Sequence, residues 1–250
     1  MIADMTITLE GERGGISAQA LQTALGASLQ LVQEAAATLG VSTGQWNVAE
    51  LSLGSVTFAL ENPAAPGAAT LVRSGMELLA RRTAIPPQWN QAMVRKARDL
   101  ARLSGSGGVH GVSVTTPGDP LLRLTAEFAA HAEQAIQARE VSLGSVHGLV
   151  DKWEDRRTHQ IGLSLDDGTT ITATYPRDLA ARILREALGH VIEARGEIRR
   201  NGEGQRVSLA LHDFTVPAET VGVSLAAIAG LYHELGDAGL TSTDVLDHRE

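Results

Sequence analysis

The chain contains no cysteine and few aromatic residues, and both absences narrow what it can be. Without cysteine there is no disulfide framework and no thiolate metal site, which fits a reducing compartment such as the cytoplasm. Aromatic residues make up only 3% of the 250 residues, so we expect alanine, leucine and valine to build most of the core. A chain of this length can bury a substantial core as one large domain or two small ones.

Long apolar runs are also missing. No stretch approaches the roughly 20 consecutive apolar residues that a membrane-spanning helix needs. The start, Met1-Ile2-Ala3-Asp4, lacks the charged region and the apolar run of a signal peptide. We therefore expect a cytoplasmic protein that does not enter a membrane.

The common signatures of enzymes are absent as well. The sequence has no glycine-rich phosphate loop, no dinucleotide fingerprint after a predicted strand, and no Gly-x-Ser-x-Gly elbow. The eight histidines are scattered, with no pair at metal-ligand spacing on one helix face. Asp166 and Asp167 precede Gly168, which indicates a hairpin turn and not a metal pair. We predict no catalytic residue, no metal site and no cofactor; an enzyme whose site assembles from scattered residues is a third hypothesis.

The charges are unevenly distributed along the chain. A net charge of −8 argues against a protein that coats nucleic acid through bulk attraction. Within 81–102, however, six basic residues accompany a single acidic one: Arg81, Arg82, Arg95, Lys96, Arg98 and Arg102. Three of them follow i, i+3, i+7 spacing and predict one basic stripe on a helix. The stripe would bind either phosphates or acidic groups of this chain or a partner, and we favour an acidic partner.

The first part of the chain, residues 1–139, alternates between strand and helix patterns. We expect strands at 5–10, 46–61 (broken at Gly54) and 109–115, and helices at 17–39, 68–82, 87–103 and 119–138. A few strands backed by several helices predict an α+β domain.

Residues 140–217 show a clearer order. We expect strands at 141–153, 159–165 and 169–175, a helix at 177–188, and strands at 191–200 and 206–216. This β-β-β-α-β-β order is that of the OB-fold, a five-stranded barrel, and Gly144 and Gly148 would permit the bend that the first strand needs. A generic α+β domain could share the order, but we favour an OB-like barrel.

An OB-like barrel implies a place for a ligand, across strands two and three between the loops that join strands one and two and strands four and five. Two sets of residues lie at these loops: Lys152, Trp153, Arg156 and Arg157 at the first, and Arg199, Arg200 and Arg206 beside the second. Together they could hold a phosphate backbone and stack a base. The alternative is that they are solvated loop charges and that Trp153 closes the barrel end. The near-neutral local charge and the scarce aromatics favour this alternative.

The tail, residues 218–250, has two short helical patterns. Its segments Ile228-Ala229-Gly230-Leu231 and Thr243-Asp244-Val245-Leu246, followed by Arg249, resemble the C-terminal arm of bacterial antitoxins that neutralise PIN-domain ribonucleases. The resemblance implies a toxin–antitoxin role with a PIN-like nuclease as partner, Ile228, Leu231 and Leu246 as apolar anchors, and Arg249 as the cation that blocks the acidic metal site of the toxin. Alternatively, the tail covers a groove of its own chain.

Two motifs in the barrel region carry a second resemblance. Gly144-Ser145-Val146-His147-Gly148 and Arg200-Asn201-Gly202-Glu203-Gly204 are similar to motifs of large bacterial proteins of unknown function, which join an α+β half to an OB-like barrel. This resemblance implies the same domain division and no activity. The sequence as a whole predicts a non-catalytic regulatory protein that binds a protein partner, with an antitoxin-like arm. The alternative is an OB-fold protein that binds nucleic acid.

Overall fold

The computed structural model describes residues 4–41, 45–52, 55–155 and 158–217. Helices and sheets are mixed along the chain, so the predicted α+β class is confirmed. Two hydrophobic cores form, one from residues between Met5 and Ala135 and the other from residues between Val146 and Phe214. Both lie within one compact unit, Met1–Thr215.

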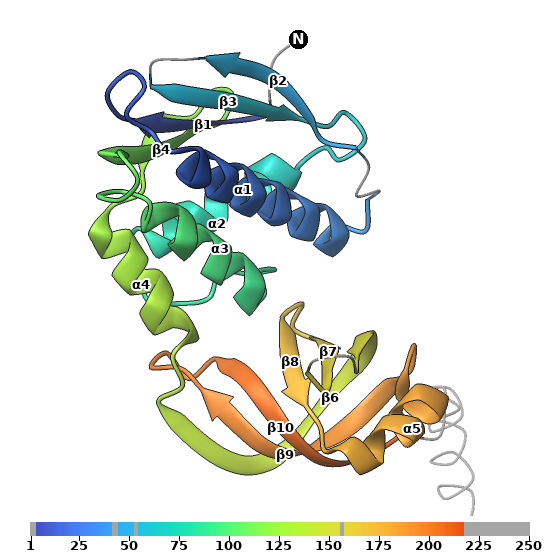
Figure 1. The fold of residues 1–250 in the computed structure, drawn as a ribbon. Coiled ribbons are helices and arrows are strands. Elements are labelled where there is room, and N and C mark those ends of the chain that lie inside the picture. Colours follow the sequence, from blue (N-terminus) through green and yellow to red (C-terminus); the bar gives the residue numbers. More distant parts are fainter. Residues whose placement is uncertain (1–3, 42–44, 53–54, 156–157, 218–250) are drawn as a thin grey trace, which may run out of the picture. The chain divides into compact units, whose positions relative to one another are not determined.

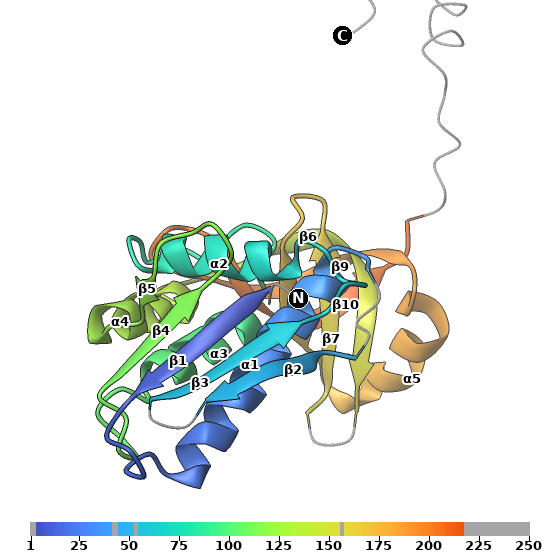
Figure 2. The ribbon, with the colours of Figure 1, turned by 90° about the horizontal axis from the view of Figure 1, so that it is seen from above.

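The first core lies between a sheet and four helices (Figure 1). The strands are β1 (Met5–Glu10), β2 (Asn47–Ser52), β3 (Val56–Glu61), β4 (Gly111–Thr115) and β5 (Leu122–Arg123). The helices are α1 (Ala18–Thr38), α2 (Ala68–Leu79), α3 (Gln91–Ala101) and α4 (Ala126–Ile136). The sheet has the order β2-β3-β1-β4-β5, and all its neighbouring strands are antiparallel. Figure 2 shows β1 between β3 and β4, with the helices behind the sheet.

Alternating and helical patterns account for these elements. Strand β1 buries every second residue, Met5, Ile7 and Leu9, as a strand with one covered face does. Helix α1 buries mainly alanines, which lets it approach the sheet closely. It begins where the Ser17 hydroxyl accepts a hydrogen bond from the backbone N–H of Ala20 at 3.1 Å. Alanine therefore supplies much of the core, as the composition predicts.

Three predicted helix boundaries are wrong, and side-chain caps explain two of them. Helix α3 begins at Gln91 and not at residue 87, because the Asn90 side chain accepts from the Met93 N–H at 2.9 Å. Helix α4 begins at Ala126 and not at residue 119, because Thr125 caps it while Leu122–Arg123 pairs with β4. Helix α2 ends at Leu79, three residues earlier than predicted.

The second core fills a closed barrel of five strands. They are β6 (Glu140–Glu154), β7 (Gln160–Leu165), β8 (Thr170–Thr174), β9 (Val191–Arg200) and β10 (Arg206–Thr215). The order around the barrel is β10-β8-β7-β6-β9, and β9 pairs with β10 to close it. Strand β6 pairs with two strands: its first part pairs with β9 and its last part, from Gly148, pairs with β7. Strands β8 and β10 run parallel, and the other pairs are antiparallel.

The helix predicted at 177–188 is divided into three short turns between β8 and β9. These are a 3-10 turn (Arg177–Leu179), α5 (Ala180–Arg182) and a wider π turn (Ile183–Ala187). The π turn ends where the Leu188 N–H reaches the Ile183 carbonyl at 3.1 Å. Ile183 and Ala187 are fully buried in the barrel core. The segment thus packs an apolar side onto the barrel without forming one regular helix.

Candidate functional site

The turn between β9 and β10 is fixed to the first part of the chain by two amide side chains. Gln205 exchanges two hydrogen bonds with Ile85: its Oε1 accepts from the Ile85 N–H at 2.8 Å and its Nε2 donates to the Ile85 carbonyl at 3.0 Å. Asn201, only 3% exposed, donates to the Ala135 carbonyl at 2.8 Å and to Gln205 Oε1 at 2.9 Å. The amide groups of this turn are therefore already hydrogen-bonded to other parts of the same chain.

A cavity of about 1180 Å³ is lined by the outer face of β7 and β8, the adjoining end of β6, and parts of α1 and α3. We call it the polar cleft. On β7 and β8 it is lined by the uncharged polar residues Gln160, Ser164, Thr170 and Thr172 and by Gly162. Its charged lining residues are Glu34 on α1, Arg95 and Lys96 on α3, and Asp151, Lys152 and Glu154 on β6. Most of the lining residues therefore carry hydroxyl, amide or charged groups.

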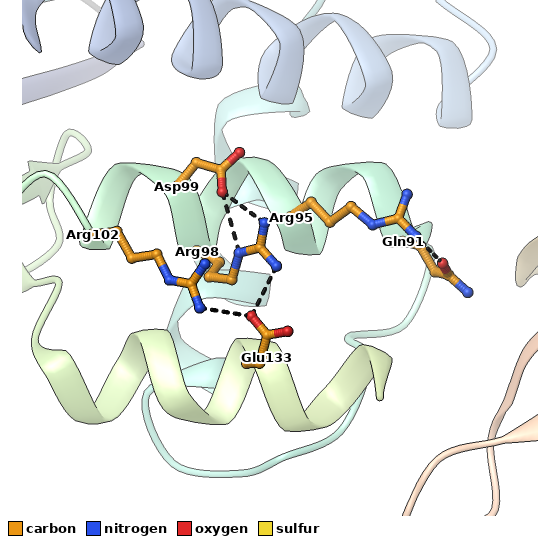
Figure 3. A network of polar contacts seen from close by, with 6 residues as sticks. All are labelled: Gln91, Arg95, Arg98, Asp99, Arg102 and Glu133. Atoms are coloured by element: carbon orange, nitrogen blue, oxygen red, sulfur yellow. Dashed lines mark hydrogen bonds and ion pairs between the residues drawn. The ribbon is translucent and has the colours of Figure 1, made fainter. Parts of the chain in front are cut away.

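The charges of the polar cleft balance, and several are already held by neighbours. Glu34 accepts a hydrogen bond from the Asn90 side chain at 2.8 Å, and the Ser164 hydroxyl donates to Asp151. Arg95 donates to Gln91 Oε1 at 2.7 Å (Figure 3). No aromatic side chain occurs among the described residues that line the cleft. The cleft can thus exchange many hydrogen bonds but has no excess of positive charge.

The predicted basic stripe on α3 is divided between two environments. Arg98 donates to Glu133 on α4 at 2.8 Å and to Asp99 at 2.9 Å, and Arg102 shares Glu133 at 2.8 Å (Figure 3). Burial lowers the pKa of Arg98, but the hydrogen bonds to Asp99 and Glu133 outweigh it and raise that pKa above its ordinary value. Arg98 and Arg102 therefore pair with acidic groups of this chain, whereas Arg95 lies at the polar cleft.

The residues predicted at the first barrel loop have separate environments. Lys152 is exposed and lines the polar cleft. Trp153 is half-buried and packs against the barrel core. Arg156 and Arg157 lie outside the described residues.

The residues predicted at the second loop are also separated. Arg199 is exposed and points out from β9. Arg200 donates to the Gly204 carbonyl at 3.1 Å, within the turn. Arg206 lies 3.6 Å from the Asp167 carboxylate. The predicted partner-binding residues Ile228, Leu231, Leu246 and Arg249 lie outside the described residues.

The uncharged face of the barrel and the amides that fix its turn are not among the residues predicted from the sequence. A signal for the face is present in the sequence, since Gln160, Gly162 and Ser164 alternate with apolar residues, as do Thr170 and Thr172. Nothing in the local pattern shows that α1 and α3 lie opposite this face. That arrangement depends on contacts between residues far apart in the chain.

No protein-family model, curated protein or solved structure matches the chain. Across the described ranges, no three histidine, aspartate or glutamate side chains gather closely enough to hold a metal ion. In the same part of the chain, no helix combines the length and the apolar character needed to cross a membrane.

Proposed function

We propose that the chain is a non-catalytic, cytoplasmic regulatory protein that binds another protein, and that the polar cleft takes a segment of that partner. The lining of the cleft carries this proposal. Hydroxyl and amide groups such as Ser164, Thr170 and Gln160 can exchange hydrogen bonds with a peptide backbone. Lys96 and Glu154 offer both signs of charge to polar side chains. Such a surface suits a segment of mixed charge.

The position of the cleft supports a binding role. We propose that the barrel is an OB-type barrel, because β8 pairs in parallel with β10 and a helical segment joins β8 to β9. In OB-folds the ligand lies on strands two and three. These strands are β7 and β8 here, and the polar cleft lies on their outer face.

Single-stranded nucleic acid is the second candidate ligand, because the same face lies beside Arg95, Lys96 and Lys152. A nucleic acid strand needs a surplus of cations for its phosphates and gains from aromatic platforms for its bases. The carboxylates of Glu34, Asp151 and Glu154 offset the three cations, and the described lining holds no aromatic ring. These observations favour a protein ligand.

Binding to the cleft can be tested with peptides selected from a random displayed library against the full-length chain. A Thr172→Trp variant fills the cleft from β8, and Thr174→Trp is its matched control, since Thr174 is exposed on the same strand but does not line the cleft. We expect the selected peptides to bind roughly tenfold or more weakly to Thr172→Trp, a loss of about 1.4 kcal/mol, and equally well to Thr174→Trp.

An oligothymidine of about 20 residues serves as the competing probe, measured by fluorescence anisotropy at about 50 and 200 mM salt. Oligonucleotide binding that weakens steeply with salt and is lost in Thr172→Trp would establish the nucleic-acid alternative. Selected peptides that bind the two variants equally would refute a role for the cleft in peptide binding.

The C-terminal arm is a separate part of the proposal and rests on its resemblance to antitoxin arms. We propose that Ile228, Leu231 and Leu246 anchor it on the partner and that Arg249 enters an acidic metal site of a PIN-like nuclease. If a PIN-domain ribonuclease is encoded beside this chain, adding the full-length chain should stop its cleavage of RNA. Arg249→Ala should restore part of that cleavage, and full inhibition by a chain ending at Pro217 would contradict the proposal.

A further inference from the structure

A second, smaller cavity of about 280 Å³ lies where the β9–β10 turn meets the loop before α3. We call it the arginine pocket, after Arg200 and Arg206, which line it together with Thr169 and Thr170. It shares Gln91 and Thr170 with the polar cleft, so the two cavities adjoin.

One donor in the arginine pocket has no acceptor among the residues that the structure describes. The Nε of Arg206 is buried and makes no hydrogen bond to any described residue. The Asp167 carboxylate lies 3.6 Å from Arg206 Nη1, which is beyond hydrogen-bond distance and involves a different nitrogen. Buried N–H groups without an acceptor are rare and unfavourable. An acceptor from outside the chain would satisfy this one.

The Asp167 carboxylate is already used by its own turn. Its Oδ1 accepts from the Thr169 N–H at 2.9 Å and from the Thr169 hydroxyl. The hydrogen bond from that hydroxyl is the main reason why the pKa of Asp167 is lowered, and the charge of Arg206 adds to it. Asp167 thus stays ionised, but it offsets only one of the two guanidinium charges that line the pocket.

The arginines have further donors to offer. A guanidinium carries five N–H groups, and that of Arg200 donates one hydrogen bond within the described part of the chain, to the Gly204 carbonyl at 3.1 Å. The planar arginine fork matches two oxygens of one carboxylate or phosphate group. The hydroxyl of Thr170, also in the lining, can donate to the same group.

We propose that the arginine pocket binds an oxyanion, a carboxylate or a phosphate group, carried by the ligand of the polar cleft. The pocket supplies a net positive charge, an unused N–H on Arg206, and a volume that fits such a group. The link to the cleft ligand rests on the proposed function, whereas the pocket itself can be tested with small anions alone.

The test records two-dimensional amide NMR spectra of the full-length chain during titration with sodium phosphate, sodium acetate or sodium chloride at constant ionic strength. We expect the Gly204 amide and the Trp89 indole, both at the pocket, to shift and saturate with phosphate, acetate or both, but not with chloride. Saturation with phosphate alone assigns a phosphate group, and saturation with acetate alone assigns a carboxylate.

Variants locate the binding. Arg200→Gln and Arg206→Gln should each weaken the anion severalfold, and Arg206→Lys should also weaken it, because lysine keeps the charge but loses Nε and the fork. Arg199→Gln removes an equal charge from the neighbouring exposed residue and should have no effect. If Arg206→Gln does not fold, Arg200→Gln decides the result.

No saturable shift with phosphate or acetate, the same shift with chloride, or an equal loss in Arg199→Gln would overturn the proposal. The outcome is separable from that of the proposed function. If the chain binds these anions but selects no cleft-dependent peptide, the arginine pocket is supported and the peptide-binding role of the cleft is refuted. The reverse result supports the cleft and refutes the pocket.

Discussion

At the scale of single residues, two amides hold the β9–β10 turn against the first part of the chain. Asn201 is buried, and its oxygen also accepts from the Glu203 and Gln205 N–H groups at 3.1 and 2.9 Å. Its nitrogen donates to the Ala135 carbonyl and to Gln205. Asn201 therefore both shapes the turn and fixes its position against the first part of the chain.

Replacing Asn201 with alanine should lower the free energy of unfolding by about 2–3 kcal/mol, because buried N–H and carbonyl groups lose their partners together. Urea denaturation measures this change. Glu203→Ala, in the same turn, is the control, since Glu203 is exposed and its side chain accepts one hydrogen bond, from Thr83 at 3.2 Å. Equal effects of the two substitutions would show that the amide does not fix the turn.

Asp213 on β10 has a pKa below the ordinary value of an aspartate. Arg182 donates to Asp213, and this hydrogen bond is the main cause of the lowered pKa of Asp213. Since the pKa is lower in the folded chain than in the unfolded chain, the ion pair contributes fully above the ordinary aspartate pKa of about 3.9 and its contribution is lost as the pH falls through the lowered value.

We expect a carbon-13 NMR titration of the Asp213 carboxyl group to give a midpoint below that of an ordinary aspartate. Arg182→Gln should return the midpoint toward the ordinary value and flatten the acid-side pH dependence of stability. An unchanged midpoint in Arg182→Gln would contradict the assigned cause.

At the scale of elements, helix α2 shows how one glycine permits close packing. A Cβ at Gly75 would lie 2.1 Å from Cε2 of Trp89, so the helix and the indole ring touch only because that atom is absent. Trp89 is 1% exposed, and its N–H donates to the Leu71 carbonyl at 3.2 Å. The ring has no room to move without losing this contact.

Gly75→Ala should therefore destabilise the chain by roughly 1–3 kcal/mol through overpacking, despite the higher helix propensity of alanine. Gly26→Ala in α1 is the matched control: no atom lies within 4 Å of the new Cβ, so the substitution should stabilise the chain by up to about 1 kcal/mol. Thermal unfolding of both variants tests the pair. Stabilisation by both substitutions would show that Trp89 gives way.

Local patterns predicted most elements because their signals are local. The alternation of apolar and polar residues predicts β9 with the bounds that the structure shows, and the Asp-Gly turn predicts the β7–β8 hairpin. Strand β5 has only two residues, too few to show an alternating pattern in the sequence. It forms by pairing with the edge of β4. The division of the segment between β8 and β9 follows from its packing on the barrel, which no local pattern encodes.

At the scale of the whole molecule, the described residues contain two complete cores within one compact unit. We expect a chain ending at Pro217 to keep the melting temperature of the full-length chain, because the barrel closes between β9 and β10 before that point. Differential scanning calorimetry measures this. If the truncation instead lowers the free energy of unfolding by the equivalent of several buried side chains, at roughly 1.5–3 kcal/mol each, residues 218–250 belong to the core.

The candidate site could be predicted only in part. Lys152 lines the polar cleft, but it lies on β6 and not in the loop where the strand order predicts it. Arg200 and Arg206 lie in a different, smaller cavity, because the turn beside them contacts Ile85. The helices that complete the cleft contribute residues more than fifty positions away in the sequence, and single-sequence patterns do not report such contacts.

We propose that the face of β7 and β8, with the start of α3 opposite, binds the partner segment. Amide hydrogen exchange of the full-length chain, with and without a selected peptide, tests it most directly. We predict slower exchange on binding in residues 160–174 and 91–96, and unchanged exchange in β1 and β3. Protection confined to other elements, or none at saturating peptide, would contradict the assignment of the polar cleft as the binding site.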